Sequence, residues 1–137
     1  MAERPDLAAM LGGLVRTLVA LETPVLEEQR LSMWGYVVLS ALDDGPVRTQ
    51  AALAQAIGAD KTRIIGTLDE LQDAGLISRE PDPADRRVRL LEITAAGRER
   101  RRAAQDRIQA KEERLLARLP AADRAAFLRA AQALASD

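Results

Sequence analysis

The stretch Thr49–Gly75, TQAALAQAIGADKTRIIGTLDELQDAG, contains two short helical patterns separated by a tight turn. The first follows Thr49 and the second follows Asp60, and both residue types are favoured N-caps because a side-chain oxygen accepts a hydrogen bond from the first helical turn. The apolar residues recur at helical spacing in each pattern: Leu53 and Ile57 in the first, then Ile64, Leu68 and Leu71 in the second. Gly75 is suited to end the second helix. Two short helices joined by a glycine-containing turn predict a helix-turn-helix.

After Gly75 the pattern predicts strands instead of helices. Leu76–Arg79 predicts one strand and Arg87–Thr94 a second. In the second segment, Arg87, Arg89, Leu91 and Ile93 occupy alternate positions, which is the two-residue period of a strand. The intervening segment 80–86, EPDPADR, contains two prolines and predicts a stiffened hairpin loop. A helix-turn-helix followed by a hairpin is the arrangement of a winged helix-turn-helix.

Helices are predicted on both sides of this unit. Upstream, apolar residues at spacings of 4, 3, 4, 3 and 4 form a short heptad-like seam suited to packing against a partner helix: Leu7, Leu11, Leu14, Leu18, Leu21 and Val25. Thr23-Pro24 is expected to interrupt that helix, because proline disfavours helical geometry in the residue before it. A second helix is predicted from Ser32 to Leu42. Downstream, a long helix is predicted over Ala95–Leu119, and a last helix follows the break at Pro120.

The predicted fold is mainly α with a small β-hairpin wing. Within a single domain of residues 1–137, we expect a winged helix-turn-helix lobe at residues 31–95. Residues 1–30 and 96–137 are expected to form a helical dimerisation region, since their leucines carry more apolar surface than the small winged unit can cover.

The composition excludes several classes of chemistry. The 137 residues include no cysteine and no histidine, which removes thiol nucleophiles, disulfides, histidine relays and nearly every zinc site. The acidic pairs Asp43-Asp44 and Asp69 with Asp73 are expected to be exposed, and an exposed pair is poorly suited to acid–base catalysis. We therefore expect no enzyme, no catalytic residues, no metal and no cofactor.

Charge and hydropathy bear on location and partners. The first six residues have no signal-peptide pattern, and no uninterrupted apolar run approaches the ~20 residues of a membrane span, so we expect a cytoplasmic protein with no membrane partner. A net charge of −1 gives no global basic field. Any nucleic-acid surface must therefore arise from local placement of charge.

The second helix of the helix-turn-helix is a candidate for DNA reading. Its first residues, Lys61, Thr62 and Arg63, stand at the positive end of the helix dipole, where a recognition helix reads base edges. Gly66 lies on the outward face, although glycine costs about 1 kcal/mol in a helix. Either an external backbone or base approaches closely there, or the glycine is an incidental weak spot, and the sequence leaves both open.

The wing is a second candidate. Arg86 and Arg87 can extend beyond the hairpin, and Asp85 can hold one guanidinium by a charged hydrogen bond. An arginine at a wing tip suits the narrow minor groove. An ordinary exposed loop with compensating charges is the other interpretation. The basic run Arg98, Arg100, Arg101 and Arg102 leaves two alternatives as well, either a phosphate or acidic partner or a solvated face.

A ligand site is predicted near the start of the second helix, because two of the three aromatic residues of the chain, Trp34 and Tyr36, lie close together there. The residues proposed to line it are Met10, Arg16, Met33, Trp34 and Tyr36. A core or interface role for the two aromatic residues is the competing interpretation.

The ordered motifs resemble the MarR-type winged-helix transcription regulators of bacteria. The resemblance covers nearly the whole chain and is strongest over 53–97, where it rests on Leu53-Ala54, Gly58, Leu68-Asp69-Glu70-Leu71, Gly75-Leu76-Ile77, Arg79, Asp85-Arg86-Arg87 and Leu91–Gly97. It implies a homodimer with intertwined terminal helices, bound to a pseudo-palindromic operator in double-stranded DNA. Residues 65 and 66, here Ile and Gly, depart from the family's usual polar and basic pair.

The resemblance also implies roles for particular residues. Thr62 and Arg63 correspond to major-groove contacts, and Arg87 with Asp85 to the minor-groove contact of the wing. Many members are repressors released by small aromatic or anionic effectors. We therefore expect a homodimeric, ligand-released repressor. The alternative is a winged-helix protein-interaction module without DNA binding, which the low net charge and Gly66 keep open.

Overall fold

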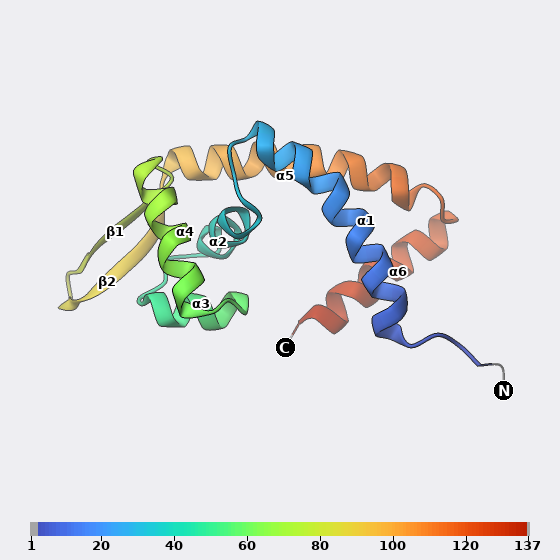
Figure 1. Ribbon diagram of the computed structural model, residues 1–137, viewed down its shortest axis with the longest axis horizontal. Coiled ribbons are helices and arrows are strands. Elements are labelled where there is room, and N and C mark those ends of the chain that lie inside the picture. Colours follow the sequence, from blue (N-terminus) through green and yellow to red (C-terminus); the bar gives the residue numbers. More distant parts are fainter. Residues whose placement is uncertain (1–2, 137) are drawn as a thin grey trace. The chain divides into compact units, whose positions relative to one another are not determined.

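The computed structural model describes residues 3–136 and confirms the predicted winged-helix fold (Figure 1). Its elements follow the order α1 (Leu7–Glu28), α2 (Met33–Asp43), α3 (Gln50–Ile57), α4 (Lys61–Asp73), β1 (Ile77–Asp82), β2 (Asp85–Ile93), α5 (Ala95–Leu116) and α6 (Ala121–Ala135). The two strands form one antiparallel sheet in which Ile77 pairs with Ile93 and Arg79 with Leu91. Val47 extends this sheet by an isolated bridge to Leu91.

The chain divides into two compact units. One consists of Met1–Glu22 and Asp106–Asp137, and the other of Thr23–Gln105. The second unit contains nearly all of the buried apolar side chains, contributed by α2, α3, α4, both strands and the adjoining ends of α1 and α5. The fully buried members are Val25, Val38, Leu39, Leu42, Leu53, Ile64, Leu68, Leu76 and Leu91.

The predicted helix caps are confirmed. The Thr49 hydroxyl accepts a hydrogen bond from the amide of Ala52 at 2.9 Å, and the Asp60 carboxylate accepts one from the amide of Arg63 at 2.8 Å. The Ser32 hydroxyl accepts the amide of Gly35 at 2.9 Å and so starts α2. Gly58 ends α3 in the left-handed conformation, with φ of 70°, which glycine adopts without a Cβ clash.

The prediction that Thr23-Pro24 interrupts the first helix is wrong. Helix α1 continues through Pro24 to Glu28. Proline removes one backbone hydrogen bond, but the buried Val25 and Leu26 anchor the next turn in the core. The helix ends instead where Arg30 adopts a φ of 55° and the amide of Leu31 bonds to the carbonyl of Leu26 at 2.9 Å.

The predicted hairpin loop was too long. Its segment 80–86 contributes to both strands, and only Pro83 and Ala84 lie between them. The Asp82 carboxylate accepts the amide of Ala84 at 2.9 Å, which closes a tight turn. Pro81 is tolerated because β1 pairs only with β2 among the described residues, so its other edge needs no backbone donor. The long helix also ends earlier than predicted, at Leu116 rather than Leu119.

Gly97 marks the junction between the hairpin and α5. A Cβ at this position would lie 2.1 Å from the carbonyl oxygen of Leu76. The Thr94 hydroxyl donates to the carbonyl of Gly75 at 2.7 Å and accepts the amide of Gly97 at 3.0 Å. The end of α4, strand β2 and the first turn of α5 therefore meet at one hydrogen-bonded joint.

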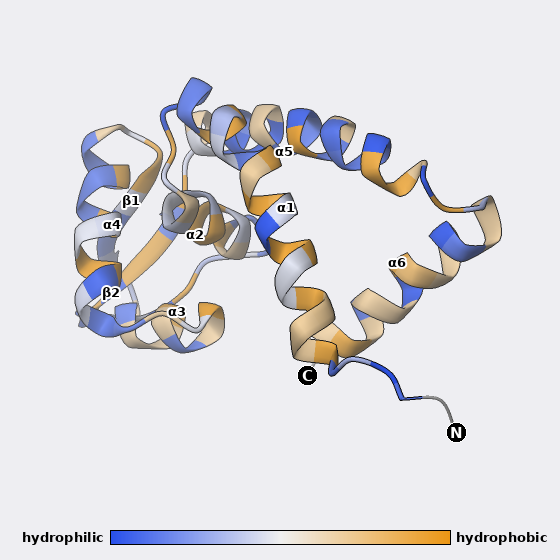
Figure 2. Ribbon diagram, turned by 45° about the vertical axis from the view of Figure 1, so that its right-hand side comes forward, coloured by the Kyte–Doolittle hydropathy of each residue, from blue (hydrophilic) through white to orange (hydrophobic). Residues whose placement is uncertain are grey.

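Helix α1 is long and apolar enough, by length and composition alone, to cross a membrane. Only 11% of its apolar window is buried within the chain. The core helix of a soluble protein passes the same test, and Arg16 and Glu22 interrupt the apolar sequence here. Hydrophobic residues are frequent along both α1 and α6 (Figure 2), and several of their large apolar side chains are exposed.

Candidate nucleic-acid interface

Helix α4 exposes a short basic end. Its buried face carries Ile64, Thr67, Leu68 and Leu71, and this fixes which residues point outward. Lys61, Thr62 and Arg63 are all exposed in the first turn. The helix dipole and the two cationic side chains at this end favour an anionic ligand such as a DNA phosphate.

Arg63 is restrained at three points. The Asp60 carboxylate accepts its amide hydrogen, and the Thr67 hydroxyl donates to its carbonyl at 3.2 Å. Its guanidinium carbon lies over the Trp34 ring, 5.9 Å from the centroid. Local sequence contains no signal for this pairing, because the two residues belong to different helices.

Gly66 faces open space on the outer side of α4. No heavy atom lies within 4 Å of the position that a Cβ would occupy. The side chain of the neighbouring Ile65 is 43% exposed. Beyond its first turn, the outward surface of α4 therefore has no side chain at Gly66 and is apolar at Ile65. The protein's own packing does not require a glycine at position 66.

The C-terminal half of α4 is acidic, and one of its carboxylates is paired with a cation. The Arg79 guanidinium on β1 pairs with the Asp69 carboxylate and also donates to the side-chain oxygen of Gln72. This contact removes one of the two outward aspartates from the electrostatic field that DNA would meet. It also fixes the base of the wing against α4.

The wing carries an exposed arginine held at its base. The Asp85 carboxylate accepts hydrogen bonds from the amide of Arg87 at 3.1 Å and from its Nε at 3.3 Å, while the Arg87 side chain remains 92% exposed. Arg86 is also exposed. Arg48 pairs with Asp82 at 3.2 Å and so ties the wing to the loop before α3, a contact that sequence reasoning missed.

Two arginines of the basic run at the start of α5 have a partner within the chain, which neither sequence-based alternative included. Arg98 and Arg101 both pair with the Asp43 carboxylate, at 3.5 and 3.2 Å. Arg101 also donates to the Ser40 hydroxyl at 3.2 Å and is only 18% exposed. These two arginines therefore fasten α5 to α2.

The residues of the predicted ligand site are divided between the two units. Met10 and Arg16 lie on the part of α1 in the first unit, whereas Met33, Trp34 and Tyr36 lie on α2 in the second. That site stays a prediction. Met33 is 40% exposed, and Trp34 and Tyr36 are half-buried.

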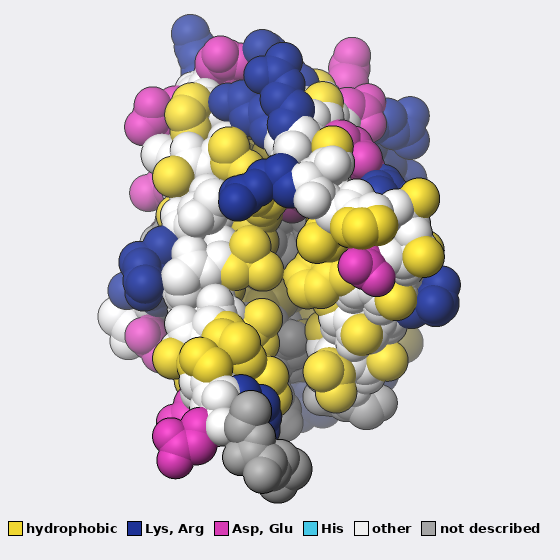
Figure 3. All heavy atoms as spheres, turned by 90° about the vertical axis from the view of Figure 1, so that its right-hand side faces the viewer, with side chains coloured by type: hydrophobic (Ala, Val, Ile, Leu, Met, Phe, Trp, Pro, Cys, Tyr) yellow, Lys and Arg dark blue, Asp and Glu magenta, His cyan; other side chains and the backbone are white. Residues whose placement is uncertain are grey.

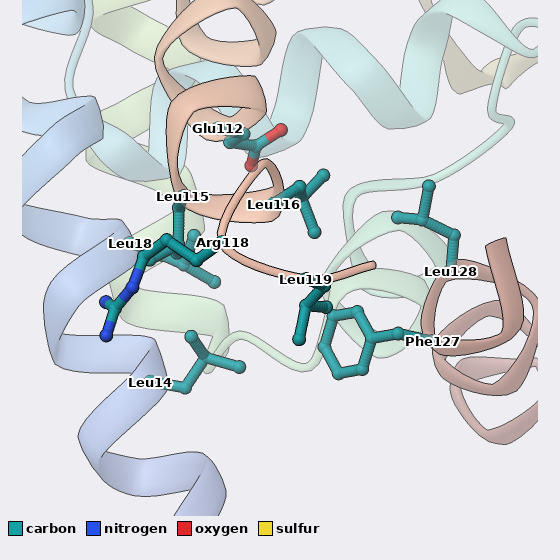
Figure 4. A pocket seen from close by; sticks show the side chains of 9 residues that line it. All are labelled: Leu14, Leu18, Glu112, Leu115, Leu116, Arg118, Leu119, Phe127 and Leu128. Carbon is teal, nitrogen blue, oxygen red and sulfur yellow. The ribbon is translucent and has the colours of Figure 1, made fainter. Parts of the chain in front are cut away.

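An apolar pocket of about 460 Å³ lies within the first unit (Figure 4). Sequence reasoning did not single out this pocket. Leu14 and Leu18 of α1 approach it from one side, and Phe127 and Leu128 of α6 from another. The remaining lining residues come from the end of α5 and the turn after it: Glu112, Leu115, Leu116, Arg118 and Leu119.

Two carboxyl groups of the first unit have perturbed acidity. Burial raises the pKa of Glu22, and the nearby negative charge of Glu112 raises it further. Burial likewise raises the pKa of Glu112, with an added contribution from Glu113. Within residues 3–136, no group of three or more acidic side chains is placed to hold a metal ion.

Residues 34–88 match the model of the MarR family. The chain is 31% identical over 96 residues to the HTH-type transcriptional repressor NicR of Pseudomonas putida. That match covers 67% of this chain and 61% of NicR, so the chain spans less than two thirds of this relative.

Solved structures show the same fold over the whole chain. The MarR family protein Rv2887 of Mycobacterium tuberculosis, in complex with DNA, is 26% identical with a TM-score of 0.82, covering 97% of this chain and 100% of that one. A complex of Rv2887 with p-aminosalicylic acid is also 26% identical, with a TM-score of 0.81, and the match covers 96% of this chain and 100% of that one. Apo MarR of E. coli matches in fold at 19% identity, with a TM-score of 0.83 and coverage of 98% and 100%. The chain belongs to the MarR family of winged-helix transcription regulators.

Proposed function

We propose that this protein is a sequence-specific DNA-binding transcription regulator, a homodimeric repressor released by a small-molecule ligand. The observation that carries the proposal is the exposed basic first turn of α4, together with the exposed Arg87 of the wing in the same compact unit. A recognition helix entering a major groove by its N-terminal half presents such a turn to base edges, and a wing arginine suits the adjacent minor groove.

The relatives support the same function. NicR is a transcriptional repressor, and Rv2887 has been crystallised with DNA. The DNA-contacting residues that we propose are those expected from the sequence: Lys61, Thr62, Arg63, Gly66, Asp85, Arg86 and Arg87. We place the DNA-binding lobe at residues 31–95 and the dimerisation region at residues 1–30 and 96–137. We assign the protein no catalytic role and a cytoplasmic location.

A homodimer accounts for the apolar surface of the first unit. Large apolar side chains are exposed on α1, on α6 and in the turn before it, and they gather on the face shown in Figure 3. They are Leu7, Met10, Leu11, Val15, Leu119, Phe127 and Leu134. A patch of this extent on a soluble protein marks an interaction surface. A second copy would cover it and would place two DNA-binding units for the two halves of a pseudo-palindromic operator.

The proposed effector is a small aromatic or anionic molecule. Rv2887 has been crystallised with p-aminosalicylic acid, which has both properties. We retain Met10, Arg16, Met33, Trp34 and Tyr36 as the proposed ligand-binding residues. Arginine supplies an anion partner and the aromatic rings supply stacking surfaces.

The experiment that tests the proposed function is binding of the purified protein to DNA upstream of its own coding region. An excess of random competitor is present, and the titration is repeated at two salt concentrations. Specific binding by a dimer, weakening steeply with salt as counterions are released, is the expected result. A folded dimer that binds neither this DNA nor random duplex at low salt would contradict the proposal and favour a protein-interaction module.

A further inference from the structure

We propose that Trp34 is a positioning residue for DNA recognition, which holds the Arg63 guanidinium in the orientation that contacts a base. This inference rests on the proposed DNA-binding function. It starts from the ring contact between α2 and α4, in which the guanidinium carbon lies 5.9 Å from the centroid of the Trp34 ring.

A cation–π contact restrains an arginine without consuming its hydrogen bonds. The guanidinium donors lie in the plane of the group and point outward at its edges. The Trp34 ring attracts the positive charge and accepts none of these donors in an N–H···O hydrogen bond, whereas a carboxylate partner would occupy some of them. Arg63 can therefore be held by Trp34 and still donate two hydrogen bonds to the O6 and N7 of a guanine.

The backbone of Arg63 is fixed at the same time. Asp60 accepts its amide and Thr67 donates to its carbonyl. A long side chain on a fixed backbone still has several rotamers, and ordering one of them on binding costs free energy. The Trp34 ring acts on this remaining freedom.

The backbone on both sides of Trp34 is anchored in the first turn of α2. Ser32 caps the helix directly before it, through the amide of Gly35. Gly35 is buried, and a Cβ there would lie 3.4 Å from a methyl carbon of Leu71, so the first turn of α2 is close to α4. The ring and the guanidinium therefore stand on two helices that pack directly against each other.

The expected magnitude follows from known cation–π energies. A partly exposed pair contributes about 0.5–1 kcal/mol, equivalent to about two- to fivefold in affinity. A dimer reading two half-sites uses the pair twice, so the effect becomes about 5- to 30-fold for each operator.

The test is a double-mutant cycle with Trp34→Leu, Arg63→Ala and the double variant. Binding is measured on operator DNA from upstream of the coding region and on random duplex. Trp34→Leu is expected to weaken operator binding about 5- to 30-fold and random-duplex binding little. The same substitution should have no further effect in the Arg63→Ala background, and Trp34→Phe should restore part of the loss. Equal losses on both duplexes, or additive losses in the cycle, would overturn the positioning role.

A second measurement does not depend on the folding of the Trp34 variants. Trp34 is the only tryptophan, so emission excited at a wavelength that tyrosine does not absorb, and its quenching by acrylamide, report on this ring alone. Arg63→Ala is expected to change both, and Lys61→Ala neither. Unchanged emission and quenching in Arg63→Ala would overturn the contact. If the wild-type protein shows no operator preference, the proposed function fails, independently of these fluorescence results.

Discussion

Asp85 and Arg87 form an ion pair across a single intervening residue of the wing, with 3.3 Å between the carboxylate oxygen and Nε. The arginine is nevertheless almost fully exposed. An exposed ion pair contributes little to stability. Its effect is to fix the direction of the Arg87 side chain, because the same carboxylate oxygen also accepts the amide of residue 87.

Arg87→Ala is expected to weaken binding to all DNA sequences alike. A minor-groove arginine acts mainly through the negative potential of the groove, so its loss should also lower the salt slope of binding by about one for each half-site, or about two for the dimer. Arg129→Ala, which removes an exposed arginine from α6, is the matched control. Equal affinity of the wild type and Arg87→Ala at low salt would refute the wing contact.

Thr62→Ala and Arg63→Ala are expected to relax sequence preference as well as affinity. A good base contact discriminates against the wrong base by about 1–3 kcal/mol. Competition between the operator and its single-base variants measures this discrimination. Random-duplex affinity of the same variants is the internal reference. If operator preference survives both substitutions, α4 does not read the bases as proposed.

Gly66→Ala distinguishes the two explanations left open for this glycine. Alanine meets no neighbouring atom and removes a helix penalty of about 1 kcal/mol, so the melting temperature should rise by about 4 °C. If DNA approaches the helix closely at this point, operator affinity should fall in the same variant. Gly58→Ala is the contrasting control, because its φ of 70° makes that substitution destabilising. A stabilised protein with unchanged affinity would identify Gly66 as an incidental weak spot.

Phe127→Glu is expected to convert the dimer into a monomer. Phe127 is 38% exposed and lines the apolar pocket of the first unit, so a charge there would be buried without a partner in the dimer. Sedimentation equilibrium measures the change. Met33→Glu alters an equally exposed apolar residue of the other unit and should leave the oligomeric state unchanged. Retention of the dimer by Phe127→Glu would place the dimer interface elsewhere.

Glu22→Gln is expected to stabilise the protein at neutral pH. Because burial raises the pKa of Glu22 above its ordinary value of 4.5, the folded chain binds a proton more tightly than the unfolded chain does. The free energy of unfolding therefore falls as the pH rises through the interval between the two pKa values.

Glutamine removes this cost, so the melting temperature of Glu22→Gln should exceed that of the wild type at pH 7, and the difference should vanish below the ordinary pKa. Glu27→Gln, on an exposed side chain of the same helix, is the control. If the wild type is as stable as Glu22→Gln at pH 7, or more stable, the upward direction of the Glu22 pKa shift is contradicted.

Local signals predicted the DNA-binding fold well. The N-caps at Thr49 and Asp60, and the apolar faces of α3 and α4, each depend on residues within two helical turns. Pro24 was misjudged because a local preference against helix was outweighed by burial of the next two residues, and burial depends on the whole core.

Contacts between distant residues could not be predicted. The basic run of α5 had no visible partner in sequence, yet Asp43 lies more than fifty residues earlier and binds two of its arginines. Arg63 with Trp34, and Arg48 with Asp82, are pairs of the same kind. The sequence identified which side chains carry charge, but not which of them neutralise one another.

The joint at Gly97 limits how the protein can move. A side chain at position 97 would collide with the Leu76 carbonyl oxygen, which lies 2.1 Å from the position of a Cβ, and the Thr94 hydroxyl links the end of α4 to the first turn of α5. A displacement of the first turn of α5 would therefore be transmitted through this joint to the end of α4 and to β2.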